Sequence, residues 1–158
     1  REYYLDRVKK LRNVRRDIAI TADVMVGFPG ESQEDFDLTV DLVRNVEFDG
    51  LYSFMYSDRK GTAAGRLDGK INKETKAARL NLLQSMQKEI TLRKNKALEG
   101  SILEVLVEGA GRRPGQLTGR SGTNKVVNFK GNSKMIGKMV MIRISQGLMN
   151  SLRGDLNG

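Results

Sequence analysis

Residue types that carry chemistry are sparse in this 158-residue sequence, which contains neither cysteine nor histidine. Within these residues, that excludes disulfides, thiolate-bound metals, histidine general bases and the Ser-His-Asp or Cys-His nucleophiles. The carboxylates nearest to a candidate pocket are Asp23 and Glu31, and no acid–base constellation surrounds them. The sequence therefore predicts a chain that binds ligands and has few means of carrying out a reaction alone.

The turn Gly27–Ser32, with the sequence GFPGES, follows an apolar run over residues 18–26. Its two glycines can adopt positive φ and let a ligand approach the backbone, while Pro29 stiffens the turn. Ser32 is the expected N-cap of the next helix, with Asp35 as its capping-box partner. The turn lacks the Lys-Ser/Thr end of a phosphate-binding loop and is too short for a dinucleotide fingerprint. It predicts either a site for a nucleotide-like ligand or only a tight strand-to-helix connection.

Two aromatic residues lie near the end of the next expected strand, residues 51–56. Because ligands of α/β proteins bind at the carboxyl ends of the strands, Phe54 and Tyr56 are placed to flank a flat ligand such as adenine. The alternative is that both are core residues, as aromatic side chains on strands often are.

The last third of the chain is strongly basic. Of a net charge of +9, residues 109–158 contribute nine Lys/Arg against a single acidic residue, Asp155. This imbalance favours a polyanionic partner, with RNA preferred over a membrane, although a generally basic surface is the alternative. No run of 18 apolar residues is present, so no membrane span is expected.

Two polar segments in this basic third are candidates for RNA contact. Gly119–Lys125 combines two cations with hydroxyl and amide groups suited to phosphate and 2′-hydroxyl contacts. Phe129, which follows it, either stacks on a base or packs in the core. Ser151–Leu156 offers Arg153 to a phosphate, with an Arg153–Asp155 surface pair as the alternative.

Alternating helices and strands position these residues in the first part of the chain. The apolar spacing predicts helices over residues 2–14, 33–46 and 73–98. Between them lie two expected strands, residues 18–26, buried on both faces, and residues 51–56. Such βα units predict a parallel sheet with right-handed crossovers. Two strands are too few for a stable parallel sheet, and an uncovered edge invites self-association, so we expect an oligomer or a swapped assembly.

The pattern changes after Gly100, where short strands are expected over residues 102–108, 116–119, 125–129, 139–144 and 148–152. Short strands at close spacing with turn signals predict a small antiparallel barrel, as in OB-like folds. The expected organisation is therefore an α/β domain over residues 1–98 and an all-β domain over residues 99–158.

Four stretches resemble the MiaB-type radical S-adenosylmethionine methylthiotransferases, in the order and spacing of that family. They are TADVMVGFPGE at 21–31, F-x-Y-S-x-R-x-G-T at 54–62, L-x-G-R-x-x-x-N-K-V-V-N-F at 117–129 and S-L-R-G at 151–154. GFPGE alone occurs widely among radical SAM enzymes, whereas the set of four is specific. The sequence departs from the family at Asp58, Lys60 and Ala63, where members usually have prolines, so we expect a looser loop there.

The resemblance implies a C-terminal fragment: the last βα units of a partial TIM-type barrel, followed by a TRAM domain, a small RNA-binding β-barrel. The parent would be a cytoplasmic transferase of tRNA processing. It would add a methylthio group to C2 of N6-isopentenyladenosine beside the anticodon, using S-adenosylmethionine (SAM) and two [4Fe–4S] clusters. The alternatives are a ribosomal protein aspartate methylthiotransferase fragment and a non-catalytic RNA-binding module; the run at 124–129 looks more like the tRNA branch.

The same resemblance assigns roles to individual residues. The adenosyl end of SAM would be lined by Val26, Gly27, Phe28, Phe54 and Tyr56. The tRNA anticodon stem-loop would be faced by Arg120, Asn124, Lys125 and Arg153. The cluster cysteines of the family have no counterpart in this sequence, so the fragment is expected to bind no cluster or other cofactor and to be inactive alone.

Overall fold

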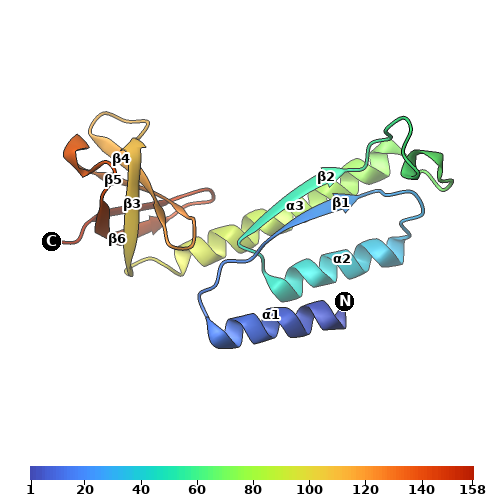
Figure 1. Cartoon of the computed structure of the whole chain (residues 1–158), viewed down its shortest axis with the longest axis horizontal. Coiled ribbons are helices and arrows are strands. Elements are labelled where there is room, and N and C mark those ends of the chain that lie inside the picture. The colour runs from blue at the N-terminus through green and yellow to red at the C-terminus, as the bar shows by residue number, and fades with distance from the viewer. The chain divides into compact units, whose positions relative to one another are not determined.

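The computed structural model describes all residues from 1 to 158 and divides them into two compact units. The first, called the α/β unit below, comprises residues 1–16 and 20–90 (Figure 1). The second, called the barrel unit, comprises residues 17–19 and 91–158. None of the helices combines the length and the hydropathy that crossing a bilayer requires.

The α/β unit contains three α-helices, two strands and one short 3₁₀ helix. In chain order these are α1 (Glu2–Val14), β1 (Thr21–Val26), α2 (Gln33–Val46), β2 (Gly50–Met55), the short 3₁₀ helix η1 (Ala64–Arg66) and α3 (Lys73–Lys96), whose last turns belong to the barrel unit. The predicted bounds of the first two helices are confirmed. The N-cap side chain of Asn72 accepts the Thr75 N–H at 2.8 Å, which explains why α3 begins at residue 73.

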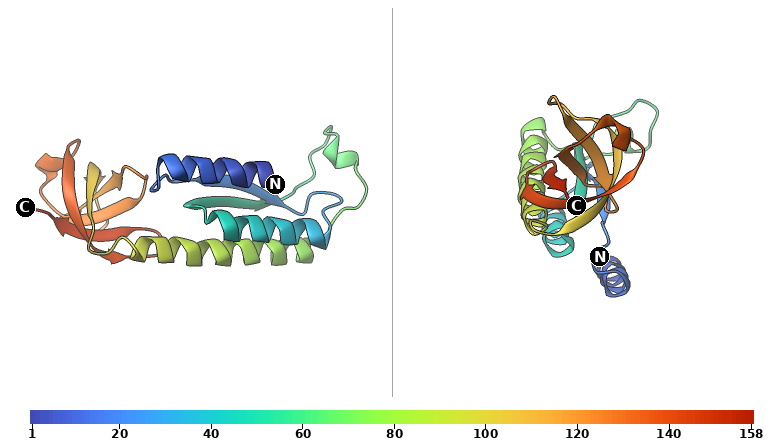
Figure 2. Two further views of the ribbon diagram at one scale, coloured as in Figure 1. Left: turned by 90° about the horizontal axis from the view of Figure 1, so that it is seen from below. Right: turned by 90° about the vertical axis from the view of Figure 1, so that its left-hand side faces the viewer.

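The two strands pair in parallel, with Thr21 opposite Gly50 and Val26 opposite Met55. Helices α2 and α3 run along one face of this sheet (Figure 2). The core on that face combines residues of α1, β1, α2, α3 and the segment before β2: Val8, Val26, Phe36, Val40, Val43, Val46, Phe48, Leu83 and Ile90. Burial of this apolar surface stabilises the α/β unit.

The opposite face of the sheet is exposed, so the prediction that the first strand is buried on both faces is wrong. Burial alternates along β1, and Thr21, Asp23 and Met25 face outward. Tyr52 and Phe54 of β2 are likewise exposed, by 69% and 46%. The physical reason is that the buried residues of all three helices belong to the core on the other face. An apolar run alone cannot say which face of a strand is covered.

The barrel unit is a closed five-stranded barrel in the order β3-β4-β5-β7-β6. The strands are β3 (Ile102–Ala110), β4 (Gln116–Ser121), β5 (Val126–Lys130), β6 (Met139–Gly147) and β7 (Leu152–Leu156), with the 3₁₀ helix η2 (Ser133–Met135) before β6. Its core is formed by alternate strand residues: Val105, Val107, Leu117, Val127, Phe129, Ile142, Ile144 and Leu152. Phe129 is 2% exposed, so it packs in the core and does not stack on a base.

Two expectations for the barrel are corrected. The last strand covers Leu152–Leu156, and not residues 148–152, because Leu148–Ser151 form the turn that leads into it. The barrel is also not wholly antiparallel, since β5 and β7 pair in parallel, with Asn128 opposite Arg153. Insertion of β7 between β5 and β6 closes the barrel and leaves no free strand edge.

Candidate functional site

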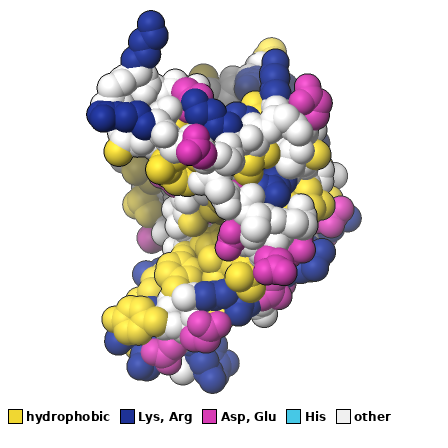
Figure 3. All heavy atoms as spheres, turned by 90° about the vertical axis from the view of Figure 1, so that its right-hand side faces the viewer, with side chains coloured by type: hydrophobic (Ala, Val, Ile, Leu, Met, Phe, Trp, Pro, Cys, Tyr) yellow, Lys and Arg dark blue, Asp and Glu magenta, His cyan; other side chains and the backbone are white.

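A hollow of about 440 Å³ lies at the carboxyl ends of β1 and β2. Its walls are mostly apolar or aromatic, and its lining is Met25, Phe28, Phe54, Met55, Tyr56, Ser57, Arg59, Thr62 and Ala64. The rings of Phe28 and Tyr56 contact each other edge to face, with centroids 5.2 Å apart. Figure 3 shows hydrophobic side chains among charged ones on the side of the molecule that carries these strand ends. The structure thus brings together Phe28, Phe54 and Tyr56, as parallel strand ends predict.

Val26 and Gly27 lie behind this hollow and do not line it. The side chain of Val26 is fully buried, and its carbonyl accepts the Tyr56 N–H at 2.8 Å. Gly27 adopts φ +75°, and a Cβ placed on it would lie 2.2 Å from Cγ of Lys76 on α3. The close approach that this glycine permits is therefore that of a lysine side chain.

The backbone N–H groups of the Gly27–Ser32 turn are largely used inside the protein. Gly27 donates to Glu31 Oε2 at 2.7 Å, and Gly30 donates to the carbonyl of Gly69 at 3.0 Å. Glu31 donates to the carbonyl of Phe28 at 2.9 Å, and Ser32 donates to the Asp35 carboxylate at 2.9 Å. These bonds leave few donors for an anion, so the turn contributes the Phe28 ring and shape to the site, not a phosphate cradle.

The Tyr56 hydroxyl is buried and faces the carboxylate of Asp58, but the distance and angles between them do not meet those of a full hydrogen bond. Burial raises the pKa of Tyr56, and the Asp58 carboxylate raises it further. Asp58 itself pairs with Lys70 at 2.9 Å, which lowers the pKa of Asp58 and raises that of Lys70. The Asp58–Lys70 pair holds together the loop in which family members usually have prolines, and Asp58 also faces the buried tyrosine hydroxyl.

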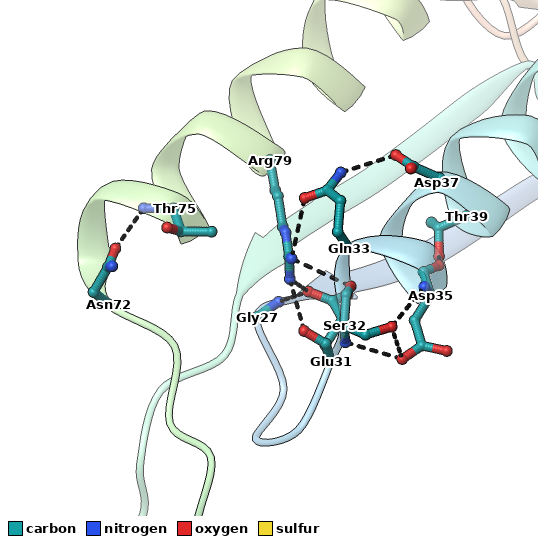
Figure 4. Close-up of polar contacts among 10 residues, drawn as sticks. All are labelled: Gly27, Glu31, Ser32, Gln33, Asp35, Asp37, Thr39, Asn72, Thr75 and Arg79. Carbon is teal, nitrogen blue, oxygen red and sulfur yellow. Dashed lines mark hydrogen bonds and ion pairs between the residues drawn. The ribbon is translucent and has the colours of Figure 1, made fainter.

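The predicted capping box at the start of α2 is confirmed. Ser32 Oγ accepts the Asp35 N–H at 3.0 Å, and the Asp35 carboxylate accepts the Ser32 N–H and hydroxyl at 2.9 and 2.7 Å (Figure 4). The side-chain hydrogen bond from Ser32, followed by the backbone one, lowers the pKa of Asp35.

Acid should weaken this cap. Because the folded-state pKa of Asp35 is lowered, its contribution to stability is present above its unfolded pKa of about 3.9 and is lost as pH falls through the folded value. We expect Asp35→Asn to abolish that part of the acid dependence and Ser32→Ala to cost about 1 kcal/mol at neutral pH. Urea unfolding between pH 2.5 and 7 measures both. Glu34→Gln, in the same helical turn, is the control; an equal effect there would contradict a role specific to the cap.

A second candidate site lies on the outer face of the barrel. A groove of about 590 Å³ adjoins a smaller one of about 230 Å³, and Arg113, Gln116, Asn128 and Arg153 line both. The groove residues also include Arg112, Lys130 and Asp155, so four cations and one carboxylate surround polar side chains. None of these four is engaged in an ion pair. Unpaired cations in a groove suit a polyanion.

Strand register explains why these residues meet. Outward-facing Thr118, Asn128 and Arg153 occupy directly opposed positions on β4, β5 and β7. Neighbouring strands lie about 4.8 Å apart, so this register produces one polar row across the barrel. The row continues to Gln146 of β6, whose Oε1 accepts from Arg153 Nη1 at 3.4 Å. Sequence reasoning missed the row because it depends on which strands are neighbours.

The other three predicted RNA contacts lie outside this groove. Arg120 donates to Glu108 Oε2 at 3.4 Å and to the carbonyl of Asn124 at 3.2 Å. Asn124 adopts a left-handed φ of 61° in the turn after β4. The ammonium of Lys125 donates to Oδ1 of Asn95 at 2.9 Å, and Asn95 in turn donates to the carbonyl of Leu148 at 2.7 Å. Arg120 and Lys125 are both half-buried, and Lys125 also contacts the buried side chain of Asn95.

The chain thus places a βα unit before a closed five-stranded barrel. The family model described as "TRAM domain" matches residues 96–156, which include all five barrel strands.

The similarity extends over nearly the whole chain. A protein named tRNA-2-methylthio-N(6)-dimethylallyladenosine synthase from Syntrophus aciditrophicus is 51% identical over 154 residues, 97% of this chain and 33% of that protein. Proteins of the same name from Thermodesulfovibrio yellowstonii and Pelobacter propionicus are 47% and 45% identical over 98% and 99% of the chain, which covers 36% of each. The chain is similar to these proteins over nearly its whole length, and it spans about a third of the length of these curated relatives.

Proposed function

We propose that this chain is the C-terminal part of a cytoplasmic tRNA methylthiotransferase, in which it completes the SAM pocket and binds tRNA. The observation that carries the proposal is the 51% identity over 97% of the chain to a protein named as a synthase of a methylthiolated tRNA nucleoside. The full-length enzyme would be a radical SAM enzyme with two [4Fe–4S] clusters. Residues 1–98 would serve the cofactor and residues 99–158 the RNA.

The hollow at the strand ends fits an adenosyl group. Its volume lies within the range of about 300–1,000 Å³ of small-molecule sites. Phe28, Phe54 and Tyr56 offer flat apolar surface to a base. SAM would supply the radical chemistry, while these residues would bind and orient its adenosyl end. Val26 and Gly27 would not contact the adenosyl group but would fix the backbone of the strand end and the turn behind the hollow.

An iron–sulfur cluster does not fit the residues of this chain. The sequence contains no cysteine, and the structure holds no group of three or more His, Cys, Asp or Glu side chains placed to bind a metal. We therefore propose that the clusters of the full-length enzyme are ligated by other residues and that the chain alone performs no methylthiolation.

The groove on the barrel supports the RNA-binding part of the proposal. Its cations suit phosphates, and the amides of Gln116 and Asn128 suit 2′-hydroxyl and base contacts. The anticodon stem-loop would be the part of tRNA that it receives. Arg153 lines this groove, whereas Arg120, Asn124 and Lys125 would contact RNA at its margin.

A chimera tests the proposed activity. The matching third of the Syntrophus aciditrophicus relative is replaced by this chain, and tRNA from a strain lacking the enzyme is analysed by mass spectrometry for the 2-methylthio nucleoside. We expect the chimera to restore the modification and the isolated chain to leave it absent. A folded chimera that binds its clusters but leaves tRNA unmodified, while the intact relative modifies it, would contradict the proposal. If the chimera instead methylthiolated an aspartate of a ribosomal protein, the result would favour the alternative of a ribosomal protein aspartate methylthiotransferase.

Self-association remains a prediction. The exposed sheet face with Met25, Tyr52 and Phe54 offers apolar surface for it. A single monomeric boundary in sedimentation velocity at high concentration would count against an oligomer.

A further inference from the structure

Arg79 of α3 is buried against the turn that carries Phe28. Its side chain is 8% exposed and its guanidinium is used as a fork (Figure 4). Nη1 donates to Glu31 Oε2 at 2.5 Å and to the Glu31 carbonyl at 3.2 Å. Nη2 donates to the Ser32 carbonyl at 3.2 Å and to Gln33 Oε1 at 3.4 Å. One side chain thus binds three consecutive residues where the turn becomes α2.

Glu31 carries this restraint to the other end of the turn. The same Oε2 that binds Arg79 accepts the Gly27 N–H at 2.7 Å. The N–H of Glu31 donates to the Phe28 carbonyl at 2.9 Å. Phe28 forms a wall of the hollow, and Glu31 holds its backbone on both sides. The Glu31 side chain accepts the N–H of the preceding Gly27, and the Glu31 N–H donates to the carbonyl of Phe28 itself. Because Arg79 binds the Glu31 side chain, it restrains Phe28 as well.

Tyr56, whose ring contacts that of Phe28, is held by the same helix. Lys76, three residues before Arg79, donates from its ammonium to the Tyr56 carbonyl at 3.2 Å. Its aliphatic part lies against Gly27, where it fills the space that a side chain would need. Residues i and i+3 share a face of a helix, so Lys76 and Arg79 hold the two strand ends together.

Stability alone does not account for this arrangement. Glu31 is 12% exposed, so both charges are largely withdrawn from water, and buried ion pairs often contribute no more stability than apolar residues of the same size. A planar fork aimed at a carboxylate and two carbonyls specifies one geometry, which a lysine could not reproduce. We propose that Arg79 is a positioning residue of the adenosyl site: it fixes the Gly27–Ser32 turn so that Phe28 forms a wall of the hollow. This inference rests on the proposed SAM-binding role of that hollow.

The test separates positioning from stability with two variants of the full 158-residue chain. Arg79→Met leaves the Glu31 carboxylate buried and unpaired, whereas Arg79→Met/Glu31→Gln removes both charges and keeps an acceptor for Gly27. Lys88→Met removes an exposed cation from the same helix and is the control. The readouts are the thermal midpoint, hydrogen exchange of the Gly27 amide, and affinity for S-adenosylhomocysteine as the probe.

We expect Arg79→Met to lower the midpoint, to speed Gly27 exchange about tenfold or more and to weaken S-adenosylhomocysteine binding by a similar factor. The double variant should regain the midpoint, because no unpaired charge remains buried, but not the slow exchange or the affinity. Lys88→Met should match wild type in all three readouts.

Recovery of wild-type exchange and affinity in the double variant would overturn the proposal, since Arg79 would then only neutralise Glu31. Unchanged Gly27 exchange in Arg79→Met would overturn it as well. A wild-type chain that fails to bind S-adenosylhomocysteine would contradict the proposed function instead, while Gly27 exchange would still decide whether Arg79 positions the turn.

Discussion

Replacement of Gly154 by alanine is expected to destabilise the barrel unit by about 3 kcal/mol or more, the upper range for overfilled cores. Gly154 lies in β7, opposite Phe129 of β5 and Ile144 of β6. A Cβ at this position would lie 2.4 Å from the carbonyl oxygen of Arg143 and 2.5 Å from Cγ2 of Ile142. Because the first of these is a backbone atom of a paired strand, it cannot move without breaking the sheet.

A matched control exists within the same barrel. Gly109 is also a strand glycine, in β3, but a Cβ there would meet no atom within 4 Å. We expect Gly109→Ala to change the free energy of unfolding by less than about 1 kcal/mol. Urea unfolding followed by hydrogen exchange of residues 102–156 measures the two variants. Equal destabilisation by both would show that the close contact at Gly154 is relieved by the structure and that the prediction is wrong.

The close contact at Gly154 also explains why glycine stands next to arginine in two stretches of the barrel. Gly119 of β4 has the same environment, since its Cβ would lie 2.3 Å from the carbonyl oxygen of Leu106. Gly119 and Gly154 belong to the two barrel stretches that resemble the methylthiotransferase family, in which each glycine neighbours an arginine. The glycines permit close packing of strands, while the adjacent Arg120 and Arg153 point outward. Such a motif therefore combines a packing requirement with a binding residue.

Features that depend on neighbours in the sequence were predictable. The start of α2 follows from Ser32 and Asp35, whose side chains cap the helix three residues apart. The place of Phe54 and Tyr56 at the hollow followed from the rule that ligands bind at the carboxyl ends of parallel strands, whereas Phe28 was assigned there by the family resemblance. The first prediction uses residues three apart in the chain, and the second uses the ends of two consecutive strands.

Features that depend on distant residues were not predictable in this way. The exposed face of β1 depends on where all three helices pack, and the parallel pairing of β7 with β5 depends on how the barrel closes. Arg79 reads as an ordinary cation of an amphipathic helix, because its partners lie more than 40 positions earlier. The only local signal was its place on the inner face of α3, one position before Leu80 and four before Leu83.

The second large effect concerns tRNA binding by the groove on the barrel. We expect Arg113→Ala/Arg153→Ala to weaken tRNA binding about tenfold or more near 0.15 M salt and to reduce the slope of log K against log salt by about 1 for each cation removed. Both arginines line the two adjoining parts of the groove, and neither is in an ion pair. Each is therefore free to neutralise a phosphate.

Two further pairs of substitutions serve as comparisons for the tRNA-binding measurement. Arg120→Ala/Lys125→Ala should weaken binding less, because Arg120 already contacts Glu108 and the Lys125 ammonium donates to Asn95. Part of its effect would also be loss of barrel stability, which thermal unfolding detects. Lys134→Ala/Lys138→Ala removes the same charge from exposed residues that do not line the groove. Fluorescence anisotropy with labelled tRNA at several salt concentrations compares all three pairs.

The pattern across the pairs decides where RNA is recognised. Equal losses for all three pairs would mean that net charge alone attracts tRNA and that the groove is not a site. A larger loss for Arg120 and Lys125 would shift the interface toward the turn after β4, which the family resemblance favours. A loss concentrated at Arg113 and Arg153 would place phosphate contacts along the row formed by β4, β5 and β7. In that case the parallel β5–β7 pairing would have a functional role, because it sets Arg153 directly beside Asn128.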